Sequence, residues 1–459
     1  MDKRLKEHQK HLTKCVENKD WKELKEALSY MNEVDIADYL ELQKVDLQAV
    51  IFRILPKEIA AGVFSYFSNT KTQEKLIEAL SDMELKEVLE ELYLDDTVDI
   101  IEDMPSSVVT RILQQSNPST RDSIHQILNY PKDCAGTVMT TEFIHLSKDI
   151  TIKEAFQKIR SLSLESETIY TCYVVEERQL LGLITVRQLL MAEESDPIID
   201  FMDSNYQFVH AHDDKEEVAL LFSKYDLSVV PVVDGERRIV GIITVDDVMD
   251  VLQEETTEDF EKMAGISPSD KPYLQSSVWE TCQARIPWLM LLMLSATFTG
   301  LIISHFESAL ATTVILASFI PMLSGTGGNS GSQASVAVIR AISLGEVGFD
   351  NIYKVLWKEI RVAVFCGMAL ATGNFIKMMV VDAFLMGNPE VTPVVAFVVC
   401  ATLVLTVLCA KVVGCILPII ADRFGVDPAV MAAPFITTVV DALSLLIYFT
   451  IATHFLHST

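Results

Sequence analysis

The sequence predicts a multidomain membrane protein: an all-α superhelical N domain, a tandem α/β repeat, and an α-helical transmembrane domain with five spans. Three observations support this fold class. The chain of 459 residues is too long for one ordinary hydrophobic core. A strand-rich pattern occurs twice in its middle, and long apolar segments fill its C-terminal part. The predicted parts are 1–130, 131–255, an acidic connecting helix at 256–284, and a membrane domain at 285–459.

The charge is distributed unevenly. The formal net charge is −27, yet residues 284–459 carry eight Lys or Arg and nine Asp or Glu. The preceding 283 residues are therefore strongly acidic, which argues against nucleic acid as a partner and is compatible with divalent cations. The first ten residues are charged and contain no apolar run, so no signal peptide is expected and the acidic part should stay in the cytoplasm.

The cysteines and histidines do not indicate a site. The spacing of the eight cysteines contains no Cys-x-x-Cys pair, so we expect reduced thiols with neither a disulfide framework nor a zinc site. None of the nine histidines joins a recognisable cluster in the sequence.

Residues 1–130 have the amphipathic periodicity of helices throughout. Turn or cap residues recur before apolar runs, as at Leu55-Pro56, Leu80-Ser81-Asp82, Leu94-Asp95-Asp96 and Met104-Pro105. This pattern is typical of stacked helical repeats, which usually present an interaction surface.

Residues 131–255 contain an internal repeat. Tyr173-Val174-Val175 followed by Leu181-Gly182-Leu183-Ile184-Thr185 matches Pro231-Val232-Val233 followed by Val240-Gly241-Ile242-Ile243-Thr244. The segment resembles a tandem pair of cystathionine-β-synthase (CBS) domains. Such pairs often bind adenine nucleotides such as ATP through an acidic residue after the Thr turn. The second repeat has Asp247 there and the first has Gln188, so the sequence leaves open whether a nucleotide binds.

An acidic linker, expected to be helical, follows at 245–283. Asp247, Asp250, Glu254 and Glu258 fall at helical spacing on one face. Such a run is often only a solvated face. However, like charges one turn apart repel, and clustered carboxylates suit a hard cation with oxygen ligands.

Apolar spans are expected at 286–306, 311–339, 360–385, 392–420 and 429–455, each long enough to cross a bilayer. Lys and Arg concentrate in the 340–361 connection and near 422, whereas the opposite loops at 305–310 and 386–391 have none. The positive-inside rule therefore predicts a multi-pass protein of the cell membrane with cytoplasmic N-terminal domains and the C-terminus outside.

The second span contains an unusual small-residue stretch, Pro321–Gln333. Glycine and serine recur every four residues along it, so two smooth helix faces can approach neighbouring helices closely. Asn329 and Gln333 stack one turn apart and need a partner helix or water at membrane depth. The alternatives are a tight helix crossing and a helix that lines a polar path.

The last span carries Asp441, an ionisable group in a membrane helix and hence a functional candidate. Thr437 and Thr438 lie one turn before it, and Pro434 is expected to leave the Val430 carbonyl unpaired. On a continuous helix, Asp427 would lie near the same face, roughly 21 Å from Asp441. Together these groups favour a cation path.

With these motifs in place, the whole chain resembles the MgtE family of magnesium transporters and channels. The resemblance implies a homodimer in membrane lipid, a pore on the two-fold axis, Asp441 as the pore carboxylate and Asp427 at the cytoplasmic mouth. It also implies that Mg²⁺ is both transported and regulatory, and that the connecting helix acts as a plug. The implied cytoplasmic magnesium ligands are Asp95, Asp214, Glu216, the backbone of Ser223, Asp226, Asp247, Asp250, Glu255, Glu258 and Asp259.

Two positions depart from the family pattern. Gly62 stands where family members can carry an acid, which weakens a magnesium bridge there, and Ala433 precedes Pro434 where a polar residue can occur. Gly328, Asn329 and Gln333 are interpreted as packing or positioning groups that bring Asp441 to the axis.

The predicted function is Mg²⁺ uptake with closure by cytosolic Mg²⁺. A CBS-regulated transporter of another divalent cation or of an anion is the alternative, and a CBS-regulated membrane enzyme is a third possibility. The anion transporter would need cationic groups at the midplane. The enzyme would need a nucleophile–base pair or a closed metal site.

Overall fold

The computed structural model describes residues 3–102, 104–163, 166–269, 271–307 and 314–456. The chain divides into two compact units, Met1–Leu252 and Gln253–Thr459.

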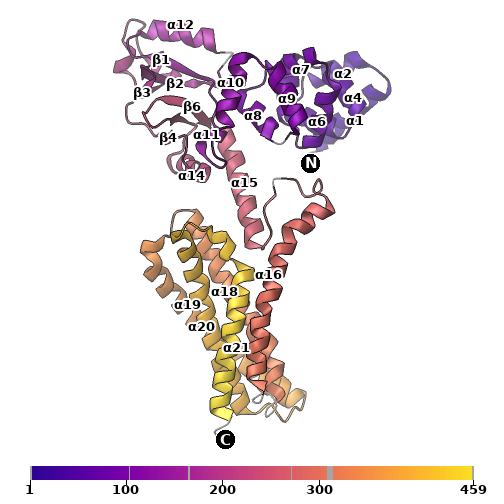
Figure 1. Ribbon diagram of the computed structural model, residues 1–459, viewed down its shortest axis with the longest axis vertical. Helices are drawn as coiled ribbons and strands as arrows, with labels where there is room; N and C mark the ends of the chain where they lie inside the picture. Colours follow the sequence, from indigo (N-terminus) through magenta and orange to yellow (C-terminus); the bar gives the residue numbers. More distant parts are fainter. Residues whose placement is uncertain (1–2, 103, 164–165, 270, 308–313, 457–459) are drawn as a thin grey trace. The chain divides into compact units, whose positions relative to one another are not determined.

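The first unit begins with short helices joined by tight turns (Figure 1). Their bounds are α1 Lys3–Glu17, α2 Trp21–Leu28, α3 Glu33–Glu41, α4 Val45–Phe52, α5 Lys57–Ser65, α6 Thr70–Ala79, α7 Asp82–Leu89, α8 Leu94–Glu102, α9 Ser106–Gln115 and α10 Pro118–Ile127.

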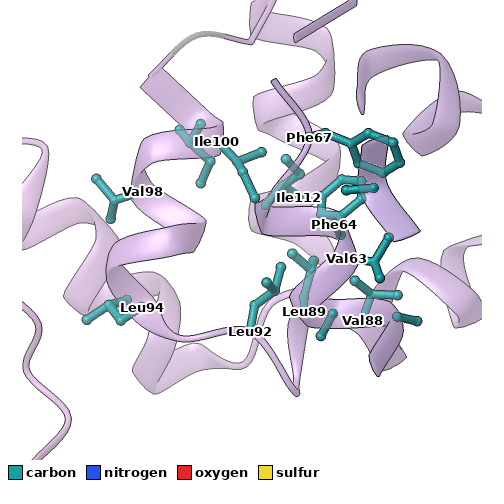
Figure 2. Packing of buried hydrophobic residues seen from close by; sticks show 14 of the residues in the cluster. Val63, Phe64, Phe67, Val88, Leu89, Leu92, Leu94, Val98, Ile100 and Ile112 are labelled. Atoms are coloured by element: carbon teal, nitrogen blue, oxygen red, sulfur yellow. The ribbon is translucent and has the colours of Figure 1, made fainter. Parts of the chain in front are cut away.

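The predicted helix starts are confirmed. Pro56 and Pro105 directly precede α5 and α9, and Ser81 caps α7 in a reciprocal capping box with Glu84. Each helix buries one apolar face in a common core. Figure 2 shows Phe64 of α5, Leu89 of α7 and Ile112 of α9 meeting within it.

The two CBS repeats have the same topology. In each three-stranded sheet the first strand pairs parallel with the second, and the second pairs antiparallel with the third. The first repeat contains α11 Ala135–Val138, β1 Phe143–Ser147, α12 Ile152–Leu162, β2 Thr168–Glu176, β3 Gln179–Thr185 and α13 Val186–Met191. After the turn η1 Ile198–Asp200, the second contains β4 Val209–His210, α14 Lys215–Tyr225, β5 Val229–Val233 and β6 Ile239–Thr244.

The helix α15 (Val245–Met263) follows β6 and carries the acidic face predicted from the sequence. The expectation of a helix through residue 283 is wrong. Gly265 adopts a positive φ of 68°, and Pro268 and Pro272 follow it. The described residues between the two helices, 264–269 and 271–277, contain no helix.

The second unit contains α16 Val278–His305, η2 Val314–Phe319, α18 Ile320–Ser343, η3 Phe349–Asn351, α19 Ile352–Lys377, the π-helical η4 Met378–Leu385, α20 Pro393–Arg423, η5 Pro428–Met431 and α21 Ala433–Leu456. Among the described residues, four segments are long and apolar enough to cross a membrane, and they contain α16, α19, α20 and α21.

The remaining predicted span corresponds to α18. It has 24 residues, about 36 Å at 1.5 Å per residue, so its length suffices. Its glycines, serines and amides make it less apolar than the other four. It packs against α20 and α21 and buries Gly327, Gly328 and Gly331 among them (Figure 1).

Candidate functional site

Asp441 lies in the third turn of α21 and is half-buried in an apolar helical bundle. Its carboxyl group has the Ser324 hydroxyl of α18 as a hydrogen-bond partner. Its Oδ1 atom is buried and has no hydrogen-bond partner among the described residues. One oxygen of this carboxyl group is hydrogen-bonded and the other is not. The second oxygen can therefore bind a cation or a proton inside the membrane.

The glycine faces of α18 make this approach of α18 to α21 possible. A Cβ atom added at Gly327 would lie 2.9 Å from the Val440 side chain, and one at Gly328 would lie 2.9 Å from Thr437. At Gly331 an added Cβ would meet Ile436 at 2.7 Å. Larger residues would therefore push α21, and with it Asp441, away from α18.

The amides of Asn329 and Gln333 lie on another side of α18, where both residues are exposed. They therefore face the lipid, a water-filled path or another copy of the chain. Because an amide in hydrocarbon is costly, contact with a water-filled path or with another copy of the chain is favoured over contact with lipid.

The last span is interrupted, so two expectations are wrong. Pro428–Met431 form one 3-10 turn, Ala432 is extended, and α21 begins only at Ala433. Pro434 thus occupies the first turn of a new helix, where no N–H is required, and does not free the Val430 carbonyl within a helix. The distance from Asp427 to Asp441 calculated for a continuous helix does not apply.

The interruption supplies polar backbone instead. The Met431 carbonyl accepts a hydrogen bond of 3.1 Å from Ser335 of α18. Thr438 donates a hydrogen bond of 3.1 Å to the Pro434 carbonyl. Met263 at the end of α15 packs against Ile339, Ala429 and Ala432 around this break.

Asp427 begins the interrupted segment and accepts a hydrogen bond from the Ala429 amide at 2.7 Å. Its other oxygen lies 2.5 Å from Nζ of Lys262, which also contacts the Glu258 carboxylate. Asp259 accepts a hydrogen bond from Ser343, and burial followed by the charge of Asp427 raises its pKa. Three acids predicted as ligands, Glu258, Asp259 and Asp427, are therefore neighbours.

In the first unit the structure brings Asp95 and Asp247 together. Burial, followed by the charge of Asp96, raises the pKa of Asp95 to about 6. Burial, followed by the charge of Asp95, raises the pKa of Asp247 to about 7. The Asp95 Oδ1 atom is buried without a partner among the described residues.

The sequence did not point to the other members of this cluster. Burial, followed by the charges of Asp95 and Asp247, raises the pKa of Glu167 to about 8. Burial, followed by the charge of Asp247, raises the pKa of Asp96 to about 6. Asp99 lies at the exposed edge of the same group. Glu167 precedes β2, far in sequence from α8, and only the fold reveals it.

The position of Gly62 is filled from another helix. A Cβ added at Gly62 would lie 2.2 Å from Oε2 of Glu33, so the Glu33 carboxylate occupies the space of a side chain at position 62. Burial raises the pKa of Glu33. Tyr66, one turn after Gly62, is within the electrostatic influence of Asp96, Glu33, Asp246 and Asp250. The helix α3 therefore places a carboxylate beside Gly62.

The remaining predicted ligands lie on two helices. Asp214 caps the N-terminus of α14 through the Glu216 amide, Ser223 is exposed near its end, and Asp226 ends it in the left-handed conformation with φ 51°. Asp250 and Glu255 extend the acidic face of α15.

The two residues compared after the Thr turns of the CBS repeats both accept hydrogen bonds from their own Thr. The Gln188 amide is engaged in a capping box with Thr185 and donates to the Phe201 carbonyl. Asp247 accepts a hydrogen bond of 2.7 Å from the Thr244 hydroxyl and another from the Thr244 backbone amide, and it lies within the electrostatic influence of Asp95 and Asp246.

Sequence reasoning also missed a charged pair between membrane helices. Nζ of Lys411 in α20 lies 3.7 Å from Glu359 of α19, with side chains 6% and 13% exposed. The Glu359 carboxylate compensates the charge of a lysine that is buried within the apolar α20.

A helical membrane bundle with a carboxylate in its interior, joined to a part rich in clustered acids, is characteristic of an ion-transport protein. Comparison with known proteins agrees. A family model described as "Divalent cation transporter" (MgtE) matches residues 320–451, the "MgtE intracellular N domain" matches 31–133, and the CBS domain matches 135–195 and 198–254.

The chain is similar to two magnesium transporters over nearly its full length. It is 34% identical over 445 residues to the magnesium transporter MgtE of Thermus thermophilus, covering 96% of this chain and 97% of the relative. It is 34% identical over 430 residues to that of Bacillus subtilis, covering 91% and 93%. This chain belongs to the MgtE family, whose members are divalent cation transporters rather than enzymes.

Solved structures match the first part of the chain. The cytosolic domain of the Mg²⁺ channel MgtE in complex with ATP has 33% identity and a TM-score of 0.50, covering 52% of this chain and 98% of that one. The soluble part of a magnesium transporter has 26% identity and a TM-score of 0.52, covering 55% and 99%.

Proposed function

We propose that this protein carries Mg²⁺ across the cell membrane into the cytoplasm and closes when cytosolic Mg²⁺ is high. The observation that carries the proposal is Asp441, a carboxylate inside the apolar bundle with an oxygen that no described residue satisfies. The names of the full-length relatives, both magnesium transporters, support Mg²⁺ as the cargo.

The surroundings of Asp441 suit a hydrated cation. Mg²⁺ dehydrates reluctantly and keeps several waters, so its path needs few direct ligands. Asp441 supplies a carboxylate, and the hydroxyls of Ser324, Thr437 and Thr438 can accept or donate to bound water. Imidazole and thiolate, which would favour zinc or copper, are not among these groups.

We propose that the pore forms between two copies of the chain. The exposed amides of Asn329 and Gln333 then face the partner copy or the pore water. The helix α16 buries none of its residues in the single chain and exposes a long apolar surface. A second copy would place two Asp441 carboxylates about one axis.

The proposed topology follows from the positive charges. With five crossings, including α18, cytoplasmic N-terminal domains require an external C-terminus. The sensing domains then lie on the side where Mg²⁺ accumulates during uptake.

Closure is proposed to use the clustered acids. The charges of Asp95 and Asp247 oppose the charge of Glu167, and the charge of Asp427 opposes that of Asp259, so both groups are strained in the absence of a cation. Mg²⁺ bound between such carboxylates favours the compact arrangement, so rising Mg²⁺ shifts the population towards the closed state. The α15 helix carries acids of both groups.

An adenine nucleotide such as ATP is proposed as a ligand of the second CBS repeat, following the ATP complex of the related cytosolic domain. The residues fit this assignment at one repeat only. Asp247 follows the Thr244 turn as the nucleotide-binding pattern requires, whereas the first repeat has the amide Gln188 in place of an acid.

Ion flux in proteoliposomes tests the proposal. The wild-type chain should pass Mg²⁺ and not Cl⁻, and Asp441→Ala should abolish Mg²⁺ flux while the variant still purifies as the same oligomer. The matched control is Asp422→Ala, an exposed acid at the end of α20, which should transport normally. Mg²⁺ flux that is unchanged in Asp441→Ala, or flux of Cl⁻, would overturn the proposal.

Gating is tested separately. The combined change of Asp247, Asp250 and Glu258 to Ala should leave flux active at high Mg²⁺ on the cytoplasmic side. If that variant closes at the same Mg²⁺ concentration as the wild type, the acids are not the sensor.

A further inference from the structure

The N-terminal helix pair contains a cluster of three chemically different ligand groups. His11 and Cys15 lie one turn apart on α1, and the turn at Lys19 brings Glu23 of α2 against them. The Cys15 Sγ and His11 Nδ1 atoms are 3.9 Å apart, and His11 Nε2 lies 3.3 Å from Glu23 Oε1. One ligand atom from each residue lies within 4.8 Å of the others.

These separations are close to those of a metal site. Zinc–nitrogen and zinc–sulfur bonds of about 2.0 and 2.3 Å in a tetrahedron place the two ligand atoms roughly 3.5 Å apart. Sγ and Nδ1 need only a few tenths of an ångström to reach that distance. Glu23 can bind the ion directly, or it can accept the proton of the second ring nitrogen, as carboxylates do behind metal-bound histidines.

The burial of the three groups also suits an ion that enters from solvent. Cys15 is 4% exposed and lies in the helical core, whereas the side chains of His11 and Glu23 are 52% and 55% exposed. A soft sulfur ligand therefore lies beneath a nitrogen and an oxygen ligand that water can reach. With three protein ligands, a fourth position stays open for water. His8, three residues before His11, is exposed on the same side of α1.

The chemistry differs from that of the transported ion. Mg²⁺ prefers oxygen ligands, whereas a set of thiolate, imidazole and carboxylate favours borderline-soft transition metals. Spacing within the sequence could not indicate the site, because it combines one cysteine with one histidine and an acid from another helix.

We propose that His11, Cys15 and Glu23 form a binding site for a divalent transition-metal ion of the Zn²⁺ type, which fastens α1 to α2. The site is independent of the transport function: it needs neither Asp441 nor the acidic clusters. The attachment of α1 to α2 then depends on the concentration of a second metal ion.

Cobalt provides a direct readout, because Co²⁺ bound to a thiolate gives a sulfur-to-metal charge-transfer absorption. The full-length protein, purified in detergent under reducing conditions, is titrated with Co²⁺ and then with Zn²⁺. We expect the absorption to appear with one Co²⁺ per chain, to persist in a large molar excess of Mg²⁺, and to vanish when Zn²⁺ displaces Co²⁺.

Variants assign the ligands. The absorption should be lost in Cys15→Ala and His11→Ala, and Glu23→Gln should weaken Co²⁺ binding by about 10–100-fold. Cys366→Ala is the matched control, because Cys366 is the exposed cysteine of α19 and should leave the absorption unchanged. Mg²⁺ flux serves as the check that each variant is folded.

Three outcomes would overturn the proposal. The first is a wild-type spectrum without thiolate absorption. The second is an absorption that survives in Cys15→Ala, since the metal would then bind another cysteine. The third is a change in thermal stability of the His11 and Glu23 variants that is equal with and without Zn²⁺, as expected of a surface ion pair alone.

Discussion

The ammonium group of Lys262 lies 2.5 Å from the Asp427 carboxylate and also contacts Glu258. Burial opposes the charge of Lys262, but its hydrogen bonds to Asp427 and Glu258 outweigh burial and raise its pKa. A tethered cation thus occupies carboxylates that the family resemblance assigns to magnesium. It joins the end of α15 to the segment that leads into α21.

Replacing Lys262 with Met should strengthen Mg²⁺ binding at this cluster. Without the ammonium group, Glu258, Asp259 and Asp427 repel one another and gain more from an external cation. The Mg²⁺ concentration that half-closes the pore should fall by roughly fivefold, equivalent to about 1 kcal/mol for a partly exposed ion pair. Flux against cytoplasmic-side Mg²⁺ measures it.

Lys271→Met is the matched control, because Lys271 pairs with Glu280 in the same connecting region. It removes the same charge without touching the cluster, and its Mg²⁺ response should equal that of the wild type. A Lys262→Met variant that needs more Mg²⁺ to close would contradict the competition argument.

The acids around Asp95 predict a pH dependence of stability. Their pKa values in the folded state are raised, to about 6 for Asp95 and to about 7 and 8 for Asp247 and Glu167. Between pH 4 and 8 the folded chain therefore binds more protons than the unfolded chain. The contribution of these acids to the free energy of unfolding is therefore fully present below pH 4 and is lost as the pH rises to 8. For Asp95 alone the rise from 3.8 corresponds to about 3 kcal/mol.

The pH dependence of stability around Asp95 is measured by hydrogen exchange of the α8 amides in the full-length protein, with correction for the intrinsic exchange rate. In EDTA, protection should fall from pH 5 to 8, and Asp95→Asn should make the fall smaller. In Mg²⁺ the fall should disappear, because the ion replaces the protons. Equal slopes with and without Mg²⁺ would show that no cation binds these acids.

Glu33→Gln should reduce the sensitivity of the pore to cytosolic Mg²⁺. The change removes the carboxylate that fills the space at Gly62 and that acts on Tyr66 together with Asp96 and Asp250. The half-closing Mg²⁺ concentration should rise by roughly fivefold, at the lower end of typical coupling between sites. Glu26→Gln, an exposed acid on α2, removes the same charge and should have no effect. Identical curves for both variants would exclude Glu33 from sensing.

The Lys411–Glu359 pair should be essential for the stability of the membrane unit. Removing one partner leaves a buried charge without compensation, which costs about 3–5 kcal/mol. Thermal unfolding in detergent should therefore show large losses for Lys411→Met and for Glu359→Gln. The double variant should recover part of the loss, and strictly additive losses would argue against a direct interaction.

Local patterns in the sequence were sufficient to predict much of the fold. Helix starts at Pro56, Ser81 and Pro105 depend on cap and turn residues, and the repeated Gly-x-x-Thr turn indicates two units of the same topology. The length and apolarity of α16, α19, α20 and α21 indicate membrane helices. These features involve residues close together in the chain.

The missed features depend on residues that are distant in sequence. Glu33 fills the space at Gly62 because α3 packs on α5, and the fold brings Glu167, just before β2, within the electrostatic influence of Asp95 in α8. Lys411 and Glu359 meet across two membrane helices. The interruption at Ala432 was missed because Pro434 fits both a kinked helix and a new helix start.

That interruption has a mechanical consequence. Ala432, with φ −85° and ψ −155°, separates the turn at Pro428–Met431 from α21, which is anchored by the Tyr448 hydrogen bond to the Leu316 carbonyl. A displacement of Asp427 with the end of α15 can therefore be taken up by rotation at one joint. We expect rotation at Ala432 to move Asp427 without separating Asp441 from Ser324, so that opening the passage and selecting the ion involve different segments.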